Sequence, residues 1–363
     1  MQTSDLDMTG VLDEAYERLH RTGPEFDGYL SNHGPMASEA LVQLGLGEHV
    51  HHWLDGYTDK LEERPKGSSR ITPEEFVDAL GDPRRFGDWL DYFDIQVANS
   101  DWRDVLAEWW PRLLPGSLAS ATHSLIRVGH AVRALRAVET PPRVAELGQA
   151  LGYWAARYQP MPGTAHPAGR LTAAQALDAV PRVPDQSGGI SARVTQLAHT
   201  PGWTQATATL MSPASAEEVP PALAALTDAG VARYLSHGHG NEIMLVHAAT
   251  APNAAMLVLD VLPKHLWLQT HTALWHVCAA ITAAYAPSQP WSGPLAMPAD
   301  SPEEAGQRAL DNGDEHIIKF TETALRAERR GLAAGPAAAA HCLQIIPDGR
   351  LSRPGGTRHT SIL

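Results

Sequence analysis

Cysteine is scarce in this sequence, and its scarcity removes two classes of protein from consideration. The 363 residues include 2 cysteines, Cys278 and Cys342, which are too few for the disulfide framework of a small secreted domain. They also lack the paired spacing of a structural zinc site. We therefore expect two reduced packing residues in a cytosolic protein.

Long apolar runs and basic clusters are missing as well. No apolar stretch reaches the roughly 20 residues that a membrane-spanning helix needs, and the acidic start MQTSDLDMTG has no signal-peptide pattern. The formal net charge of −13 disfavours a nucleic-acid backbone or an anionic membrane as the main partner. We expect a soluble, cytoplasmic protein whose partners are small molecules.

Strand signals are sparse, whereas helical periodicity recurs along most of the chain. Hydrophobic residues make up 44% of the sequence, which is enough for a substantial core. We predict an all-α protein with a single large helical domain over residues 1–335. Within it, residues 161–221 are rich in Pro, Gly, Ser and Thr and are predicted to form an irregular excursion. Residues 336–363 are predicted to form an irregular C-terminal tail.

Familiar catalytic motifs are also absent. The sequence has no phosphate loop, no GxGxxG after a strand, no GxSxG elbow and no plausible Cys/His nucleophile pair. A nucleotide cofactor bound by a familiar motif is therefore not expected. What the chain has in excess is histidine, with 18 residues. Histidine is the commonest metal ligand and the side chain that titrates nearest to neutral pH.

Four of these histidines lie on apolar faces of separate predicted helices: His33, His123, His247 and His316. One such histidine alone is most often a hydrogen-bonded core residue, and we interpret His271 and His276 in that way. Four together need partners for all their ring nitrogens. A metal ion would satisfy one nitrogen of each.

Lys319 lies one turn from His316, on the same face of a predicted helix. Burial favours the neutral amine of a lysine, and a neutral amine reacts with carbon dioxide to give a carbamate, an anionic oxygen ligand. The competing interpretation is a lysine that reaches solvent or pairs with Asp314, Glu315 or Glu322. The residues alone leave both interpretations open and favour the second.

Four motifs appear in order along the chain: NHGPMASEAL, THSLIRVGHAVRAL, LVHAATAPNA and GDEHIIKFTETAL. Together they make the chain similar to the questin oxidase-like family from about Asp13 to Arg330. This family includes fungal enzymes that oxidatively open a quinone ring of anthraquinones. A related fungal ring-cleaving enzyme holds a non-haem iron with four histidines and a carboxylated lysine. Carried onto the matching motifs, the resemblance implies these metal ligands: His33, His123, His247, His316 and Lys319. It also reverses the preference for Lys319 and favours the carbamate.

Two positions depart from the fungal pattern. Glu39 stands after the first motif, where fungal members carry additional histidines, and His130 stands where they often have another residue. These differences concern the shape of the substrate pocket and leave the five implied ligands in place.

The resemblance implies a non-haem iron-dependent oxygenase that cleaves a ring of a polycyclic aromatic polyketide, such as an anthraquinone-like compound, in secondary metabolism. Its expected cofactors are Fe(II), dioxygen and the carbon dioxide that forms the carbamate on Lys319, with NADPH as a further candidate. The catalytic candidates are Arg127, His130 and Asp314. Asp314 and Glu315 are expected to orient the ligands, and Trp109, Trp275 and Phe320 are candidates for a flat pocket.

Two alternatives belong to other classes. One is a metal-free Baeyer–Villiger-type monooxygenase that uses NADPH, although the chain has no dinucleotide fingerprint. The other is a non-catalytic helical binding protein for an aromatic pathway intermediate.

Overall fold

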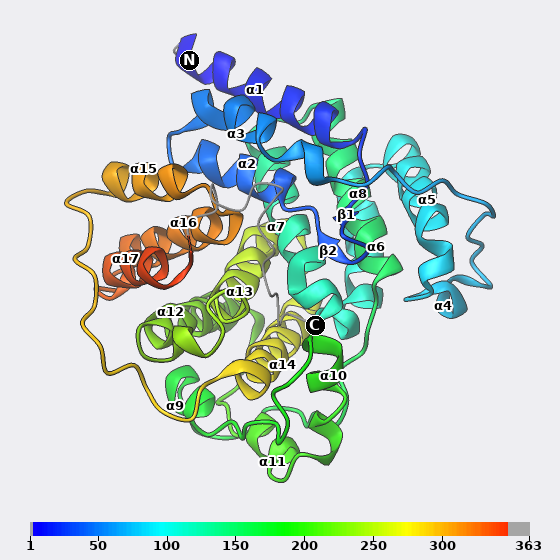
Figure 1. Cartoon of the computed structure of the whole chain (residues 1–363). Coiled ribbons are helices and arrows are strands. Elements are labelled where there is room, and N and C mark those ends of the chain that lie inside the picture. Colours follow the sequence, from blue (N-terminus) through cyan, green and yellow to red (C-terminus); the bar gives the residue numbers. More distant parts are fainter. Residues whose placement is uncertain (1–2, 348–363) are drawn as a thin grey trace. The chain divides into compact units, whose positions relative to one another are not determined.

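The computed structural model of the chain describes residues 3–347, with side chains from residue 10 onward. Within this part it contains 17 α-helices and one two-stranded sheet, so the predicted all-α class is confirmed (Figure 1). The chain divides into two compact units, Met1–Pro160 with Leu257–Leu266, and Met161–Met256 with Trp267–Leu363. A single domain over residues 1–335 stays a prediction.

The first unit is built around α7 and α8. Helices α5 and α7 both pack along α8, and α2 packs against α7. The short strands β1 and β2 pair antiparallel, with Glu25 opposite Ser31. The elements are α1 (Thr3–Leu19), β1 (Glu25–Phe26), β2 (Leu30–Ser31), α2 (Gly34–Gln43), α3 (Val50–Asp55), α4 (Phe76–Ala79), α5 (Phe86–Asn99), α6 (Trp102–Leu113), α7 (His123–Ala137) and α8 (Pro141–Ala156).

Aromatic side chains fill part of the core of this unit. The Trp109 ring lies 5.5 Å from the Trp89 ring and 5.0 Å from the Phe93 ring, between centroids, and Trp109 is 1% exposed. Edge-to-face contacts of this kind stabilise a core beyond the area that they bury. Trp109 therefore packs in the interior, and its assignment to a substrate pocket stays a prediction.

In the second unit, α16 packs against α12, α15 and α17, and α14 packs against α12. The elements are α9 (Ala173–Asp178), α10 (Ile190–Val194), α11 (Trp203–Thr207), α12 (Val219–His237), α13 (His247–Val258), α14 (Trp267–Tyr285), α15 (Pro302–Asn312), α16 (Glu315–Arg329) and α17 (Gly335–Ile345). The last two residues of α13 belong to the first unit.

Two further aromatic residues predicted to line a pocket also lie in a core. Trp275 is fully buried and its Nε1 donates a hydrogen bond to the Thr207 carbonyl oxygen at 2.7 Å. Phe320 is fully buried with its ring 4.6 Å from that of Tyr234. The assignment of both side chains to a substrate pocket stays a prediction.

Short 3-10 helices join many of these elements. They are η1 (Gly47–His49), η2 (Thr58–Lys60), η3 (Pro83–Arg85), η4 (Leu114–Gly116), η5 (Ala119–Thr122), η6 (Leu197–His199), η7 (Ala216–Glu218), η8 (Gly238–Gly240), η9 (Leu259–Val261) and η10 (Lys264–Leu266). Residues 161–221 hold three short α-helices, α9 to α11, separated by irregular segments.

The prediction places the start of the irregular C-terminal tail too early in the chain. Residues 335–345 form α17, with Pro336 in its first turn, so the irregular tail expected over 336–363 is wrong for this stretch. Proline is tolerated in a first helical turn because its missing N–H has no intrahelical acceptor there, and the alanines that follow favour helix. Residues 348–363 lie outside the described part of the chain.

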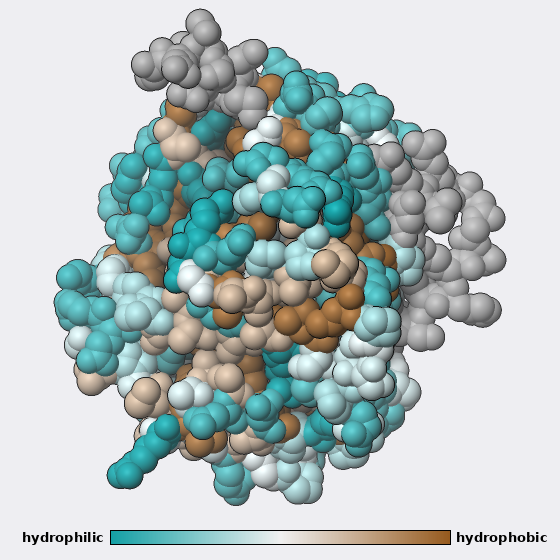
Figure 2. Space-filling model, turned by 90° about the vertical axis from the view of Figure 1, so that its left-hand side faces the viewer, coloured by the Kyte–Doolittle hydropathy of each residue, from teal (hydrophilic) through white to brown (hydrophobic). Residues whose placement is uncertain are grey.

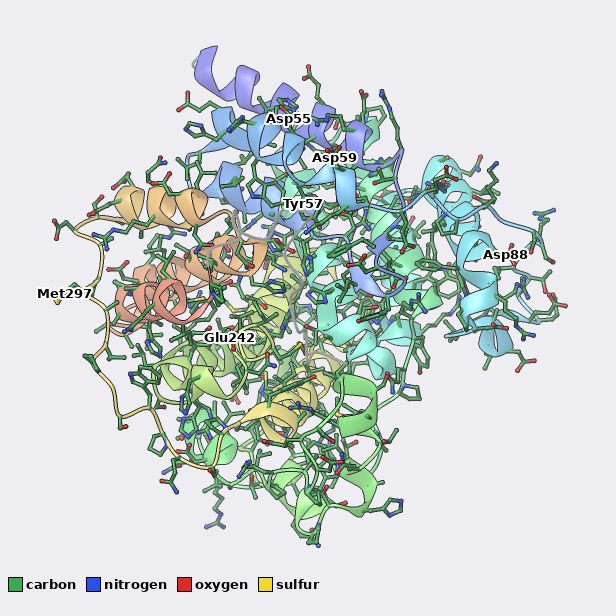
Figure 3. The ribbon with its side chains drawn as sticks, in the orientation of Figure 1. Asp55, Tyr57, Asp59, Asp88, Glu242 and Met297 are labelled. Carbon is green, nitrogen blue, oxygen red and sulfur yellow. The ribbon has the colours of Figure 1, made fainter. Side chains whose placement is uncertain are left out.

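Hydrophilic residues dominate the face shown in Figure 2, where they surround a smaller apolar area. Among the described residues, the most exposed large apolar side chain is Met297, at 81%. It points outward from the segment between α14 and α15 (Figure 3). No helix in this part of the chain is both long and apolar enough to cross a bilayer. Cys278 and Cys342 are buried and free, as expected.

Candidate functional site

The four candidate histidines share one position in the fold, because each lies where a helix begins. His33 is the N-cap of α2, His123 and His247 are the first residues of α7 and α13, and His316 is the second residue of α16. All four are buried. The N-terminal end of a helix carries partial positive charge and disfavours a cation. These positions therefore suit neutral imidazoles, which is the form that binds a metal.

The first unit brings His33 and His123 together. Their Nε2 atoms lie 2.8 Å apart, and the rings meet edge to face with centroids 4.4 Å apart. The Nδ1–H of His123 donates to the Ser120 carbonyl oxygen at 2.5 Å. A neutral His123 therefore presents its lone pair on Nε2, directed at the same point as His33 Nε2.

A strained turn places the Ser120 carbonyl there. Ser120, Ala121 and Thr122 follow one another with φ values of 48°, 54° and 73°, and none of them is glycine. Left-handed backbone costs roughly 1–2 kcal/mol per residue for L-amino acids. Strain of this kind persists only where the surrounding structure enforces it, and it clusters at functional sites. Here the turn ends directly before His123 and supplies the acceptor for its ring.

Glycine at Ala121 should reveal this strain. In Ala121→Gly, relief of the left-handed conformation, about 1–2 kcal/mol, offsets the lost methyl burial and the added freedom of the unfolded chain. We expect a free energy of unfolding within about 1 kcal/mol of wild type in urea titrations. Ala134→Gly, a buried alanine inside α7, is the matched control and should cost about 2 kcal/mol. An equal loss in both variants would show that the turn is unstrained.

Tyr57 is a residue beside this histidine pair that the sequence analysis missed. Its hydroxyl oxygen accepts a hydrogen bond from the backbone N–H of His33 at 2.6 Å. Figure 3 shows Tyr57 on the segment that follows α3, and Lys60 Nζ lies 4.1 Å above its ring. A second anchor is Asn32, whose Oδ1 accepts from the Gly34 N–H at 2.9 Å. No local sequence pattern predicts this role of Tyr57, because the hydrogen bond joins residues 24 positions apart.

The second unit brings His247 and His316 together, with ring centroids 5.5 Å apart. His247 Nδ1 lies 3.1 Å from the Met244 carbonyl oxygen, which accepts its proton. Gly313, with φ of 83°, ends α15, and Asp314 then caps α16 by accepting from the His316 N–H at 2.8 Å. The same carboxylate oxygen lies 3.3 Å from His316 Nδ1. Asp314 thus holds the backbone at His316, and its carboxylate lies beside the ring.

Three of the four histidines therefore have Nδ1 beside a backbone carbonyl or a carboxylate: His123, His247 and His316. Metal-binding histidines are held in this way, since the outer contact selects the tautomer that leaves Nε2 for the ion. Within each unit, two histidines therefore lie close together with nitrogens that could bind a metal ion.

Lys319 is the most unusual side chain in the second unit. It is 1% exposed, and its Nζ has no hydrogen-bond partner among the described residues. Burial lowers its pKa from 10.5 to about 8, although the charges of Glu315 and Asp314 act in the opposite direction. The amine neither reaches solvent nor forms an ion pair with a described residue. A buried, unpartnered amine is expensive to keep and chemically reactive.

Arg127, a predicted catalytic residue, is engaged in a buried ion pair. Its Nε and Nη2 donate to Glu146 at 2.5 and 2.7 Å, and both residues are buried. Glu146 also lies 2.8 Å from His20 Nε2. This pair ties α7 to α8 one turn beyond His123. The geometry supports a positioning role for Arg127.

His130, the second catalytic candidate, forms a dyad with Glu39. The Nδ1 atom of His130 lies 2.6 Å from Glu39 Oε2, and Arg133 Nε donates to Glu39 Oε1 at 2.7 Å. Burial raises the pKa of Glu39, but the charge of Arg133 and the hydrogen bond from His130 outweigh it and lower the pKa to about 2. Glu39 is therefore an anion that holds the Nδ1–H tautomer of His130.

His271 and His276 are the remaining histidines of interest, and their interpretation from sequence as packing residues stays a prediction. His271 is 1% exposed, and burial followed by the influence of His276 lowers its pKa to about 4. His276 Nε2 lies 2.9 Å from the Ala165 carbonyl oxygen. Burial likewise lowers the pKa of His276. Both rings are neutral near pH 7.

A cavity of about 600 Å³ opens in the first unit. Its lining includes His20, Arg64, Asp94, Val97, Glu139 and Gln149. Asp94 already binds Arg64 at 2.6 Å and Gln149 at 2.6 Å. None of the proposed ligands or catalytic candidates lines the cavity, so we do not assign it to the substrate.

Comparison with known proteins identifies the family of the chain. No curated protein is significantly similar to the chain. The model of the family described as Questin oxidase-like matches residues 30–323, which is more than half of the chain and includes His33, His123, His247, His316 and Lys319. Proteins of this kind are oxidases, and the family name points to anthraquinone-type substrates. The chain therefore belongs to the questin oxidase-like family and is an oxidoreductase that acts on a small molecule.

Proposed function

We propose that the protein is a non-haem iron oxygenase that opens a ring of a polycyclic aromatic polyketide of the anthraquinone or hydroquinone type. The observation that carries this proposal is the buried Nζ of Lys319, one turn from His316, with no partner among the described residues. A carbamate on this amine would be an anionic oxygen ligand beside a histidine whose Nδ1 faces a carboxylate.

The donor set suits iron. The proposed ligands are His33, His123, His247, His316 and the carbamate of Lys319. Four imidazoles and one anionic oxygen are ligands that Fe(II) accepts, and one coordination position would remain open. When bound, the iron would supply the activation of dioxygen for the reaction with the aromatic ring. The orphaned Lys319 Nζ and the anchored Nδ1 atoms of three histidines support this fit.

The chain's own residues would prepare the substrate and hold the ligands. In the proposal His130 removes the proton of a phenolic hydroxyl through Nε2, while Glu39 holds the Nδ1–H of the same ring. A phenolate ring is more electron-rich than a phenol and reacts more readily with activated oxygen. Arg127 keeps α7 in position through Glu146, and Asp314 orients His316.

The iron content of purified protein tests the centre directly. We expect close to one iron per chain in wild type and none in either His123→Ala or His316→Ala, measured by plasma mass spectrometry after anaerobic loading. These residues belong to different units, so the loss of all iron from each variant means that both serve one ion. His199→Ala, in η6, is the control and should keep its iron.

Other outcomes would point elsewhere. Half of the iron remaining in each variant would mean two separate sites. No iron in wild type would contradict the proposal and bring forward a metal-free monooxygenase or a binding protein. Oxygen uptake with hydroquinones, with and without NADPH, then separates these two.

A further inference from the structure

Helices α13 and α16 face each other along polar side chains in the second unit. The His247 and His316 rings lie 5.5 Å apart, between centroids. Further along both helices, Asn253 Nδ2 donates to Thr323 Oγ1 at 3.3 Å. The two contacts are separated by six residues on α13 and by seven on α16, in the same direction along the chain. The helices therefore run side by side and parallel over about two turns.

Thr250 and Lys319 occupy the middle of this contact. Thr250 lies three residues from both His247 and Asn253, and Lys319 lies three residues from His316. Residues at these spacings share a helix face. A long helical side chain also leans back toward the N-terminus, so the Lys319 amine reaches toward the first turn of α16. The Thr250 hydroxyl, in the first turn of α13, belongs to the face of that helix that carries His247 and Asn253 and meets α16.

The Thr250 hydroxyl is a donor without an acceptor. Thr250 is 3% exposed, and its Oγ1 has no hydrogen-bond partner among the described residues. Two other buried helical threonines in this unit donate to the carbonyl four residues earlier: Thr227 to Leu223 at 3.0 Å and Thr282 to Cys278 at 2.8 Å. A buried hydroxyl that makes no such bond costs free energy unless something else accepts from it.

A carboxylated Lys319 would provide that acceptor and would need the donor. The Nζ lone pair attacks the carbon of carbon dioxide, an N–C bond forms, one C=O π bond breaks, and one amine proton leaves to water. The product carries two oxygens that share one negative charge, and a metal would bind one of them. The acidic neighbours Asp314 and Glu315 only accept hydrogen bonds, so they cannot stabilise the other. The positive end of α13 favours an anion at this place.

We infer that the Thr250 hydroxyl donates a hydrogen bond to the carbamate oxygen of Lys319 that does not bind the metal, and so stabilises the modified lysine. This inference rests on the proposed function. It makes Thr250 a positioning residue for the fifth ligand, placed by a neighbouring helix. Outer partners of metal ligands commonly change metal affinity by about 10- to 100-fold.

Isosteric replacement of two buried threonines tests the inference. Thr250→Val removes the donor, and Thr321→Val is the matched control. Thr321 is fully buried with an unpartnered hydroxyl, but it lies two residues from Lys319, on another face of α16. Metal-free wild type and variants are titrated anaerobically with Fe(II) in ¹³C-labelled bicarbonate, and the carbamate is followed by its ¹³C NMR signal.

We expect Thr250→Val to weaken iron binding about 10- to 100-fold and to reduce the carbamate signal, with both restored by higher bicarbonate. Thr321→Val should match wild type. Thr250→Ser keeps the hydroxyl and should retain wild-type affinity even if the valine variant folds poorly.

Equal carbamate and iron binding in Thr250→Val and wild type would overturn the inference. Equal losses in the serine and valine variants would also overturn it. Wild type that binds iron without a carbamate signal would overturn the role of Thr250 and, with it, the carbamate ligand of the proposed function, and would leave the four histidines as the iron ligands. Wild type that binds no iron would overturn the proposed function as well.

Discussion

Lys319→Met is expected to abolish iron binding and, with it, oxygen uptake with quinone or hydroquinone substrates. Methionine fills the same buried space but cannot form a carbamate, so the proposed centre loses its anionic ligand. Iron analysis and oxygen-electrode assays on the purified variant measure both effects. Lys66→Met, at an exposed position, is the control and should keep iron and activity. A Lys319→Met variant that binds iron and is active would contradict the carbamate proposal.

The same substitution should stabilise the protein once metal and carbon dioxide are removed. The unmodified Lys319 has a pKa lowered to about 8 by burial, against 10.5 in water. Below pH 8 the folded protein therefore carries a protonated, buried amine, at a cost on the order of 3 kcal/mol. This cost falls as pH rises from 8 to 10.5, because the unfolded chain then binds more protons than the folded one.

Urea titrations of metal-free wild type across this pH range should show stability that rises with pH. The free energy of unfolding of Lys319→Met should depend less on pH. At pH 7 it should exceed that of metal-free wild type by a few kcal/mol. A variant that is less stable than metal-free wild type at pH 7 would show that the amine has a favourable partner in the folded protein.

Glu39→Gln is expected to lower the free energy of unfolding by about 3–5 kcal/mol at pH 7, because it removes the anion of a buried ion pair and leaves the cation of Arg133 behind. The folded pKa of Glu39 is about 2, below its usual 4.5, so the carboxylate stabilises the fold above pH 4.5. This contribution is lost as pH falls toward 2. Wild type and variant should therefore converge in stability at acid pH, measured by urea unfolding followed by circular dichroism.

The same substitution at a surface glutamate tests whether the loss of stability in Glu39→Gln comes from the buried ion pair. The Glu48 side chain is 80% exposed, and Glu48→Gln should change stability by less than about 1 kcal/mol. If Glu39→Gln were equally mild, the dyad with His130 would contribute little to the fold. Its role in holding the His130 tautomer would then have to be tested by activity alone.

The contacts that support the site join residues distant in sequence, which explains why sequence reasoning missed them. Glu39 meets His130 across 91 positions, and Tyr57 holds the His33 backbone across 24. No periodicity encodes such pairs, since they arise only when separate helices pack. Arg127 illustrates the consequence. Its place one turn from His123 suggested contact with substrate, whereas the fold turns it to Glu146 on α8.

Local backbone also escapes sequence reasoning where no special residue marks it. The predicted helix that carries His123 begins at that residue, as α7, because the three residues before it are in left-handed backbone. Glycine normally signals such a turn, and here none is present. The prediction was wrong at 335–345, where Gly, Pro and Ala suggested an irregular tail but form a helix.

By itself, the sequence determined the all-α class, the family and the five residues proposed as ligands, because helical periodicity and ordered motifs are local properties of a chain. Only the tertiary structure decided which histidine nitrogen faces inward, which carboxylates are already paired, and that the Lys319 amine and the Thr250 hydroxyl are both buried without a partner among the described residues. The physical reason is that protonation, tautomer and burial depend on which groups from other helices surround a side chain, and packing alone brings those groups together.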